Sequence, residues 1–73
     1  MSRKVAIVTG ASSGIGKQIA KNLHRNGMDV YAVSRKVYQM NELDDLGIHT
    51  RHLDVTDYEE VDQVVNQIAK ETG

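Results

Sequence analysis

The sequence contains no cysteine, no proline, no tryptophan and no phenylalanine. Without cysteine, disulfides and thiolate chemistry are excluded, and a reducing, cytoplasmic setting is the natural expectation. Without proline, the turns are marked by the six glycines. The apolar runs are too short to span a bilayer, and the start of the chain leads into a predicted strand, not a signal peptide.

Neither positive nor negative charge predominates in the sequence. The formal net charge is -1, with both signs mixed along the chain, so no general binding to nucleic acid or to a membrane surface is expected. Hydrophobic residues make up 40% and charged residues 26%, which is typical of a globular fold. The 73 residues suffice for one small domain.

Apolar patterns predict strands and helices in alternation, and hence an α/β fold with a parallel sheet. The predicted strands are residues 4–9, 29–34 and 48–54, and the predicted helices are residues 14–26, 37–46 and 57–72. The first strand is apolar throughout, which predicts burial on both faces, as in a central strand. The third strand has poorly alternating polarity, which favours an edge of the sheet.

The first helix carries an apolar stripe at helical spacing, which predicts the face that packs on the sheet. The stripe consists of Ile15, Ile19, Ala20 and Leu23.

A glycine-rich turn, T-G-A-S-S-G-I-G at residues 9–16, joins the first strand to the first helix. Gly10 permits a positive φ, while Gly14 and Gly16 remove Cβ atoms that would hold a ligand or the strand away. The first helix amides have no partner within the helix, and the helix dipole favours an anion there. The turn therefore predicts a phosphate site, against the alternative that it only shapes a loop.

The spacing G-x-x-x-G-x-G differs from the commoner G-x-G-x-x-G, and the full string resembles the cofactor loop of the short-chain dehydrogenases/reductases, which bind NAD(H) or NADP(H). The resemblance covers essentially all of this chain. The chain corresponds, however, only to the amino-terminal half of such an enzyme. It implies a half-Rossmann βαβαβα unit with strand order 3-2-1. That order leaves the first strand open on one side, for pairing with a second copy or with the missing half.

The cofactor preference depends on Ser34-Arg35-Lys36, at the end of the second strand. In dinucleotide folds an acid there binds the ribose hydroxyls, whereas a base meets a 2′-phosphate. Arg35 can form a planar fork on phosphate, which favours NADP(H), although a plain surface arginine is the alternative. NADP-preferring relatives often have a second base just before the middle glycine, where this chain has Ser13.

The resemblance also places Asp54 and Val55 where the family reads the adenine ring. A competing role at this point is helix capping, since Thr56 and Glu59 have the spacing of a capping box. Both roles are compatible, because that cap would leave Asp54 free.

The resemblance thus implies a full set of cofactor-binding residues. Those for the pyrophosphate are Gly10, Ser12, Ser13, Gly14, Ile15 and Gly16; those for the 2′-phosphate are Ser34 and Arg35; those for the adenine are Asp54 and Val55. No metal site is expected, because His49 and His52 point to opposite faces of a strand.

The family's catalytic serine and Tyr-x-x-x-Lys pair have no counterpart in these residues. The residues four places after Tyr31, Tyr38 and Tyr58 are Arg35, Glu42 and Asp62. We therefore assign no catalytic residue. The sequence predicts the NADP(H)-binding segment of an oxidoreductase that transfers hydride between the cofactor and a carbonyl or alcohol; the alternative is an isolated or designed structural fragment without activity.

Overall fold

A computed structural model describes residues 4–72 of the chain. Its elements follow one another as β1 (Val5–Thr9), α1 (Gly14–Arg25), β2 (Asp29–Ser34), η1 (Val37–Met40), α2 (Asn41–Asp45), β3 (His49–His52) and α3 (Tyr58–Thr72). The predicted α/β alternation is confirmed, and β2 has the predicted bounds. The helix predicted over residues 37–46 is divided into the 3-10 helix η1 and the short α2.

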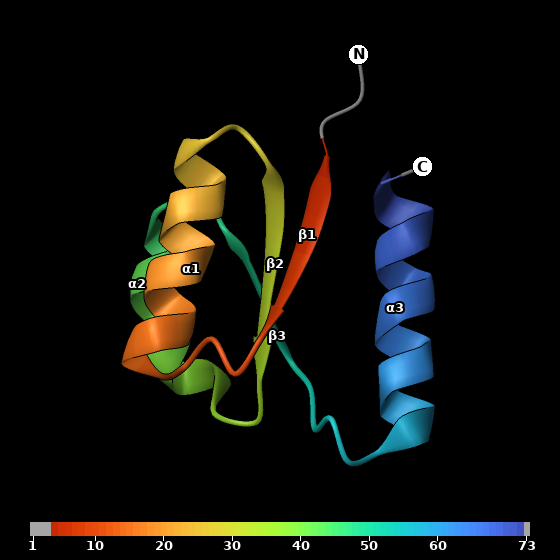
Figure 1. Ribbon diagram of the computed structural model, residues 1–73. Helices are drawn as coiled ribbons and strands as arrows, with labels where there is room; N and C mark the ends of the chain where they lie inside the picture. Colours follow the sequence, from red (N-terminus) through yellow and green to blue (C-terminus); the bar gives the residue numbers. More distant parts are fainter. Residues whose placement is uncertain (1–3, 73) are drawn as a thin grey trace.

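The three strands form one parallel sheet in the order β1-β2-β3, which confirms the predicted order 3-2-1 (Figure 1). Val5 lies opposite Asp29 at one end of the β1–β2 ladder, and Thr9 lies opposite Val33 at the other. Because all pairs are parallel, the carboxyl ends of the strands meet at one edge of the sheet. The turns that follow β1 and β2 are thereby brought together.

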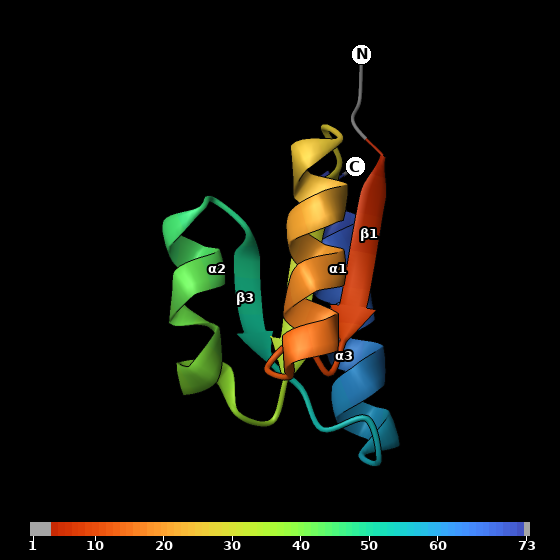
Figure 2. The same ribbon diagram turned by 60° about the vertical axis from the view of Figure 1, so that its left-hand side comes forward.

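Helices cover both faces of the sheet. Helices α1 and α2 lie on one side and α3 on the other, as Figures 1 and 2 show together. The main core lies on the α1 and α2 side and is built from Val8, Ala11, Ala20, Val30, Ala32, Met40, Leu43 and Ile48. Within residues 4–72, none of the helices has the length and apolar character that a bilayer crossing requires.

The prediction that β1 is buried on both faces is wrong. Val8 is 8% exposed and packs in the core, but Val5 and Ile7, which alternate with it, are 38% and 41% exposed. Strand β1 lies at an edge of the described sheet, and its second face is left partly uncovered. The apolar run therefore predicted the strand correctly but did not predict how much of it is buried.

The predicted apolar stripe of α1 is only partly the packing face. Ala20 is fully buried and Leu23 packs against the core, whereas Ile15 and Ile19 are 80% and 47% exposed. The helix meets the sheet through Gly16 and Ala20, which are four residues apart and buried. Their small size allows the close contact. Ile15 and Ile19 lie beside this contact and remain exposed.

Two polar contacts, both made by Glu71, help to attach helix α3 to the sheet. Tyr31, which is 2% exposed, donates a hydrogen bond to Glu71 Oε2 at 3.2 Å, and Arg51 forms an ion pair with Glu71. The Arg51 hydrogen bond lowers the pKa of the Glu71 carboxyl below its ordinary value, while burial raises the pKa of Tyr31. Ile68 is the buried apolar contact of this helix.

The pKa of Glu71 predicts a contribution to stability that acid removes. Because its folded value is depressed, the contribution is present above the unfolded pKa, near 4, and is lost as pH falls through the folded value. Glu71→Gln should lower the urea midpoint at pH 7 and flatten its decline from about pH 5 to about pH 2. Parallel declines in the two proteins would contradict this role. The measurement is urea unfolding across that pH range.

A second stability prediction concerns Gly16. A Cβ at this position would lie 2.4 Å from the Gly10 carbonyl oxygen, which is a backbone atom, whereas a Cβ at Gly14 meets nothing within 4 Å. Gly16→Ala should therefore destabilise by about 1–3 kcal/mol, as overpacking does. The matched control Gly14→Ala should be neutral or stabilising by up to about 1 kcal/mol. Urea unfolding followed by circular dichroism tests both, and equal effects would contradict the packing argument.

Candidate functional site

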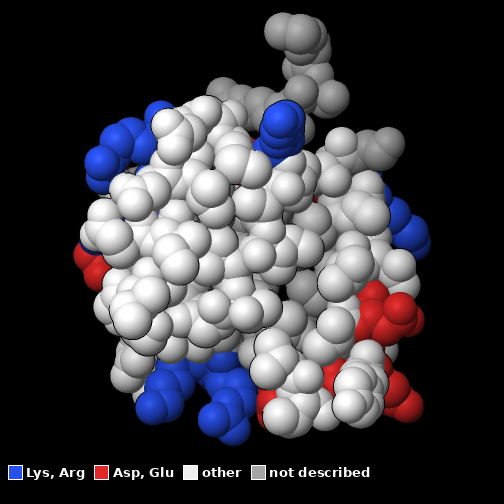
Figure 3. All heavy atoms as spheres, viewed as in Figure 1, with Lys and Arg blue, Asp and Glu red and all other residues white. Residues whose placement is uncertain are grey.

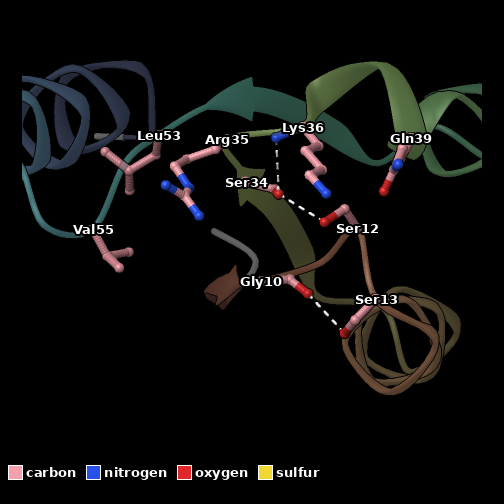
Figure 4. A pocket seen from close by; sticks show the side chains of 9 residues that line it. All are labelled: Gly10, Ser12, Ser13, Ser34, Arg35, Lys36, Gln39, Leu53 and Val55. Carbon is pink, nitrogen blue, oxygen red and sulfur yellow. Dashed lines mark hydrogen bonds between the residues drawn. The ribbon is translucent and has the colours of Figure 1, made fainter.

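A cavity of about 410 Å³ lies at the carboxyl edge of the sheet (Figure 4). Its walls come from the turn after β1, the turn after β2, η1 and the segment after β3. The lining residues are Gly10, Ser12, Ser13, Ser34, Arg35, Lys36, Gln39, Leu53 and Val55. The fold therefore gathers residues from four separate segments at one opening.

The glycine-rich turn forms the first wall. Gly10 has φ +67°, the left-handed region that favours glycine. The amide of Ser13 donates to the Gly10 carbonyl at 3.2 Å, and the Ser13 hydroxyl donates to the same oxygen at 3.0 Å. These bonds close the turn immediately before α1.

Ser13 also caps α1, since its Oγ accepts a hydrogen bond from the Gly16 amide at 3.2 Å. Of the first helix amides, that of Gly16 is therefore already occupied by a side chain. The helical ladder begins with the bond from Lys17 N to Ser13 O, so the amides of Gly14 and Ile15 precede it. A Cβ built on Gly14 would meet no heavy atom within 4 Å, so the space beside this residue is open.

The turn after β2 forms the second wall and is bonded to the first. Ser34 is 8% exposed, and its hydroxyl donates to Ser12 Oγ at 2.8 Å. The same Ser34 oxygen accepts the amide of Lys36 at 3.1 Å, as the dashed lines in Figure 4 show. A backbone bond from Ala11 N to Val33 O, at 3.3 Å, adds to this connection. The two turns therefore hold each other in place.

Two basic residues, Arg35 and Lys36, stand at this wall, both exposed. Among residues 4–72, neither lies within ion-pair distance of a carboxylate, whereas Lys17, Lys21 and Arg51 do. Basic side chains project at the lower edge of the molecule in Figure 3, where the strands end. Their charge is available to an anion in the cavity.

The segment after β3 differs from the prediction. Asp54 is not free: its Oδ1 accepts the Thr56 amide at 3.0 Å and the Thr56 hydroxyl at 2.6 Å. These bonds, with a smaller contribution from the charge of Arg35, lower the pKa of the Asp54 carboxyl below its ordinary value. The carboxyl therefore stays ionised beside the cavity, while Val55 lines it.

The predicted capping box of Thr56 and Glu59 is wrong. Helix α3 begins one residue later than expected, and Asp57 caps it by accepting the Glu60 amide at 3.2 Å. The Thr56 hydroxyl is instead bonded to Asp54, and the Glu60 carboxylate accepts the Asp54 amide at 3.0 Å. Because the Thr56 hydroxyl is bonded to Asp54, it does not cap α3, and Asp57, one residue later, does so instead.

The predicted site residues are brought together in part. Gly10, Ser12, Ser13, Ser34, Arg35 and Val55 line the cavity, while Gly14, Ile15, Gly16 and Asp54 lie in the adjoining segments. Gln39 and Leu53 also line it and were not predicted. The position of Leu53, directly before the predicted Asp54-Val55 pair, is a signal that could have indicated its place in the lining. Gln39 had no such signal, because the apolar pattern of its predicted helix indicated packing alone.

The parallel sheet, the helices on its two faces and the glycine-rich turn into α1 define the amino-terminal half of a Rossmann-type α/β domain. The family model for the short chain dehydrogenases matches residues 4–73. The chain therefore belongs to the short-chain dehydrogenase family, which uses nicotinamide cofactors.

Individual relatives show the same relation. The chain is similar to the NADPH-dependent 1-acyldihydroxyacetone phosphate reductase of Schizosaccharomyces pombe, with 38% identity over 99% of this chain and 25% of the relative. A short-chain dehydrogenase of Penicillium ochrochloron is 39% identical over 100% of this chain and 28% of its own length. The chain spans about a quarter of the length of these relatives.

Solved structures agree with this assignment. A short-chain dehydrogenase from Streptomyces avermitilis superimposes with a TM-score of 0.86 at 35% identity, over 93% of this chain and 26% of that one. A menthone neomenthol reductase from Mentha piperita superimposes with a TM-score of 0.82 at 31% identity, over 100% of this chain and 29% of that one.

Proposed function

We propose that this chain binds the adenosine-diphosphate portion of NADP(H), as a partial dinucleotide-binding domain over residues 1–73. The observation that carries the proposal is the meeting, in one cavity, of the glycine-rich turn and the exposed Arg35–Lys36 pair. The amides of Gly14 and Ile15, with the positive end of the α1 dipole, suit the pyrophosphate. Gly10, Ser12, Ser13 and Gly16 shape that part of the site.

The preference for NADP(H) over NAD(H) rests on the charge of the cavity lining. Arg35 and Lys36 line it, and among residues 4–72 no carboxylate does. An acid at the end of β2 would accept from the ribose hydroxyls, whereas the Arg35 fork suits a 2′-phosphate dianion. The NADPH dependence named for the S. pombe relative supports the same preference.

The adenine is assigned to the segment after β3. Val55 supplies an apolar wall, and the carboxylate of Asp54, one oxygen of which is bonded to Thr56, can accept the exocyclic amine through its other oxygen. The lowered pKa of Asp54 keeps that acceptor ionised near neutral pH.

The complete enzyme would transfer hydride between NADP(H) and a carbonyl or alcohol substrate in the cytoplasm. We assign no catalytic residue to this chain, so the chemical step belongs to residues of a longer polypeptide. Strand β1 is an edge strand of the described sheet, and its open backbone edge suits a further strand, either from that polypeptide or from a second copy. A stable monomer of this chain in sedimentation velocity would count against the second copy.

Calorimetric titration with NADPH, NADH and adenosine 2′,5′-bisphosphate tests the cofactor proposal. Arg35→Asp should weaken NADPH binding by about 10-fold to 100-fold, because it removes a charged hydrogen-bonding group, and should change NADH binding far less. Arg25→Asp makes the same charge change at the far end of α1 and serves as the control. Equal weakening of both cofactors by Arg35→Asp would refute the 2′-phosphate role.

Gly14→Val tests the close approach of phosphate to α1. A Cβ there would meet no heavy atom within 4 Å, so the fold should persist. It would, however, cover the amides offered to the pyrophosphate, and both NADPH and NADH should lose at least about 10-fold in affinity. Circular dichroism verifies the fold. A folded variant that binds both cofactors normally would exclude this site. No heat from the wild-type chain with any ligand would favour the structural-fragment alternative.

A further inference from the structure

A glutamate on α3 reaches back to the segment that follows β3. Glu60 lies in the first turn of α3, and its Oε1 accepts the amide of Asp54 at 3.0 Å. The same oxygen is bonded to His52 Nδ1, also at 3.0 Å. Because an ionised carboxylate only accepts, the imidazole presents its Nδ1 hydrogen to it. One donor at the end of β3 and one just beyond it therefore converge on a single oxygen of α3.

This contact differs from the usual one of a glutamate at this place in a helix. In a capping box, the glutamate three residues after the cap accepts the amide of the cap residue itself. Here the cap is Asp57, whose amide already donates to the Asp54 carbonyl at 2.9 Å. Glu60 instead reaches the amide of Asp54, six residues back. Its side chain therefore holds the segment before the helix and not the helix end.

Asp54 is held at three points, and Glu60 supplies the one that comes from within α3. The Asp54 carbonyl accepts from Asp57, and the Asp54 Oδ1 accepts the amide and the hydroxyl of Thr56. These two partners belong to the same tight turn as Asp54 and move with it. Within residues 4–72, no hydrogen bond to Asp54 Oδ2 is found, so this is the oxygen left for a ligand.

We propose that Glu60 is a positioning residue that orients the Asp54 carboxylate to accept the exocyclic amine of adenine. The inference rests on the proposed function and deepens it, because it concerns how the site distinguishes adenine from other bases. Glu60 is not among the residues that line the cavity, so it acts through Asp54. Its bond fixes the Asp54 amide, the bonds from Thr56 fix Oδ1, and Oδ2 remains to accept.

Preorganisation is the physical reason why a bond outside the cavity affects binding inside it. The residue before Asp54 is anchored to the end of β2, since the Leu53 amide donates to the Ser34 carbonyl at 3.0 Å. With Glu60 in place, the amides of two successive residues are fixed. Without Glu60, the turn can rotate about the Leu53 anchor, and the free energy of ordering it then opposes ligand binding.

Calorimetric titration of NADPH and of its purine analogue, in which hydrogen replaces the exocyclic amine, tests the proposal. The wild-type chain should bind NADPH about 10-fold more tightly, because the analogue offers the carboxylate no donor. Glu60→Ala should weaken NADPH binding by about threefold to 10-fold and leave the affinity for the analogue within about twofold of the wild-type value. The ratio of the two affinities is the readout, since a loss of stability alone would not change it.

Conservative rescue and a matched control complete the test. Glu60→Gln keeps an oxygen that can accept the Asp54 amide, and it should preserve the ratio to within about twofold. It also removes the charge, which separates the hydrogen bond from any repulsion between the two carboxylates. Glu59→Ala makes the same truncation at an exposed residue of the same helical turn, and both affinities should stay within about twofold of the wild type. Urea unfolding of each variant establishes that it is folded under the titration conditions.

The outcomes separate this inference from the proposed function. Equal weakening of both ligands by Glu60→Ala would overturn the positioning role and leave the adenine contact of Asp54 intact. A Glu60→Gln variant as poor as Glu60→Ala would also overturn it, because the accepting oxygen would then not be decisive. A wild-type chain that binds NADPH and its analogue equally would refute the adenine contact itself, and this inference with it. A wild-type chain that binds neither would refute the proposed function.

Discussion

The close approach of α1 to the end of β1 is the contact on which the rest of the site depends. Only a hydrogen at Gly16 fits against the Gly10 carbonyl, and this lets the first turn of the helix lie directly behind the strand. The amides of Gly14 and Ile15 thereby stand at the start of α1, close to the carboxyl end of β1. A longer side chain at residue 16 would separate the helix from the strand and open the cavity wall.

The parallel sheet supplies the second requirement. Since β1 and β2 end at the same edge, their turns are neighbours, and two bonds join them: one between the Ser34 and Ser12 hydroxyls and one between the backbones of Ala11 and Val33. The third strand ends at that edge too, and brings Val55 to the same cavity. Separate backbone segments thus form one site because topology, and not sequence proximity, unites them.

Local patterns in the sequence predicted the elements and their order, but not every contact. The apolar run of β2, with Gly27 shortly before it and the basic Arg35-Lys36 directly after it, was sufficient to give its bounds. The exposure of Ile15 could not be predicted, because a helical stripe does not show which of two adjacent faces carries the close glycine contact. The cap of α3 was misplaced because Thr56 bonds to Asp54, a competition between neighbouring side chains that spacing alone does not reveal.

Overall charge is a poor guide to what this site attracts. A formal net charge of -1 would disfavour a polyanionic ligand if charge were spread evenly. The charges are, however, unevenly placed: Glu59 and Glu60 lie in the first turn of α3, where they suit the helix dipole, whereas Arg35 and Lys36 line the cavity. Screening at physiological salt limits each charge to about 8 Å. A phosphate in the cavity is therefore governed mainly by the charges around it, which are the two cations that line the cavity and the ionised Asp54 carboxylate beside it.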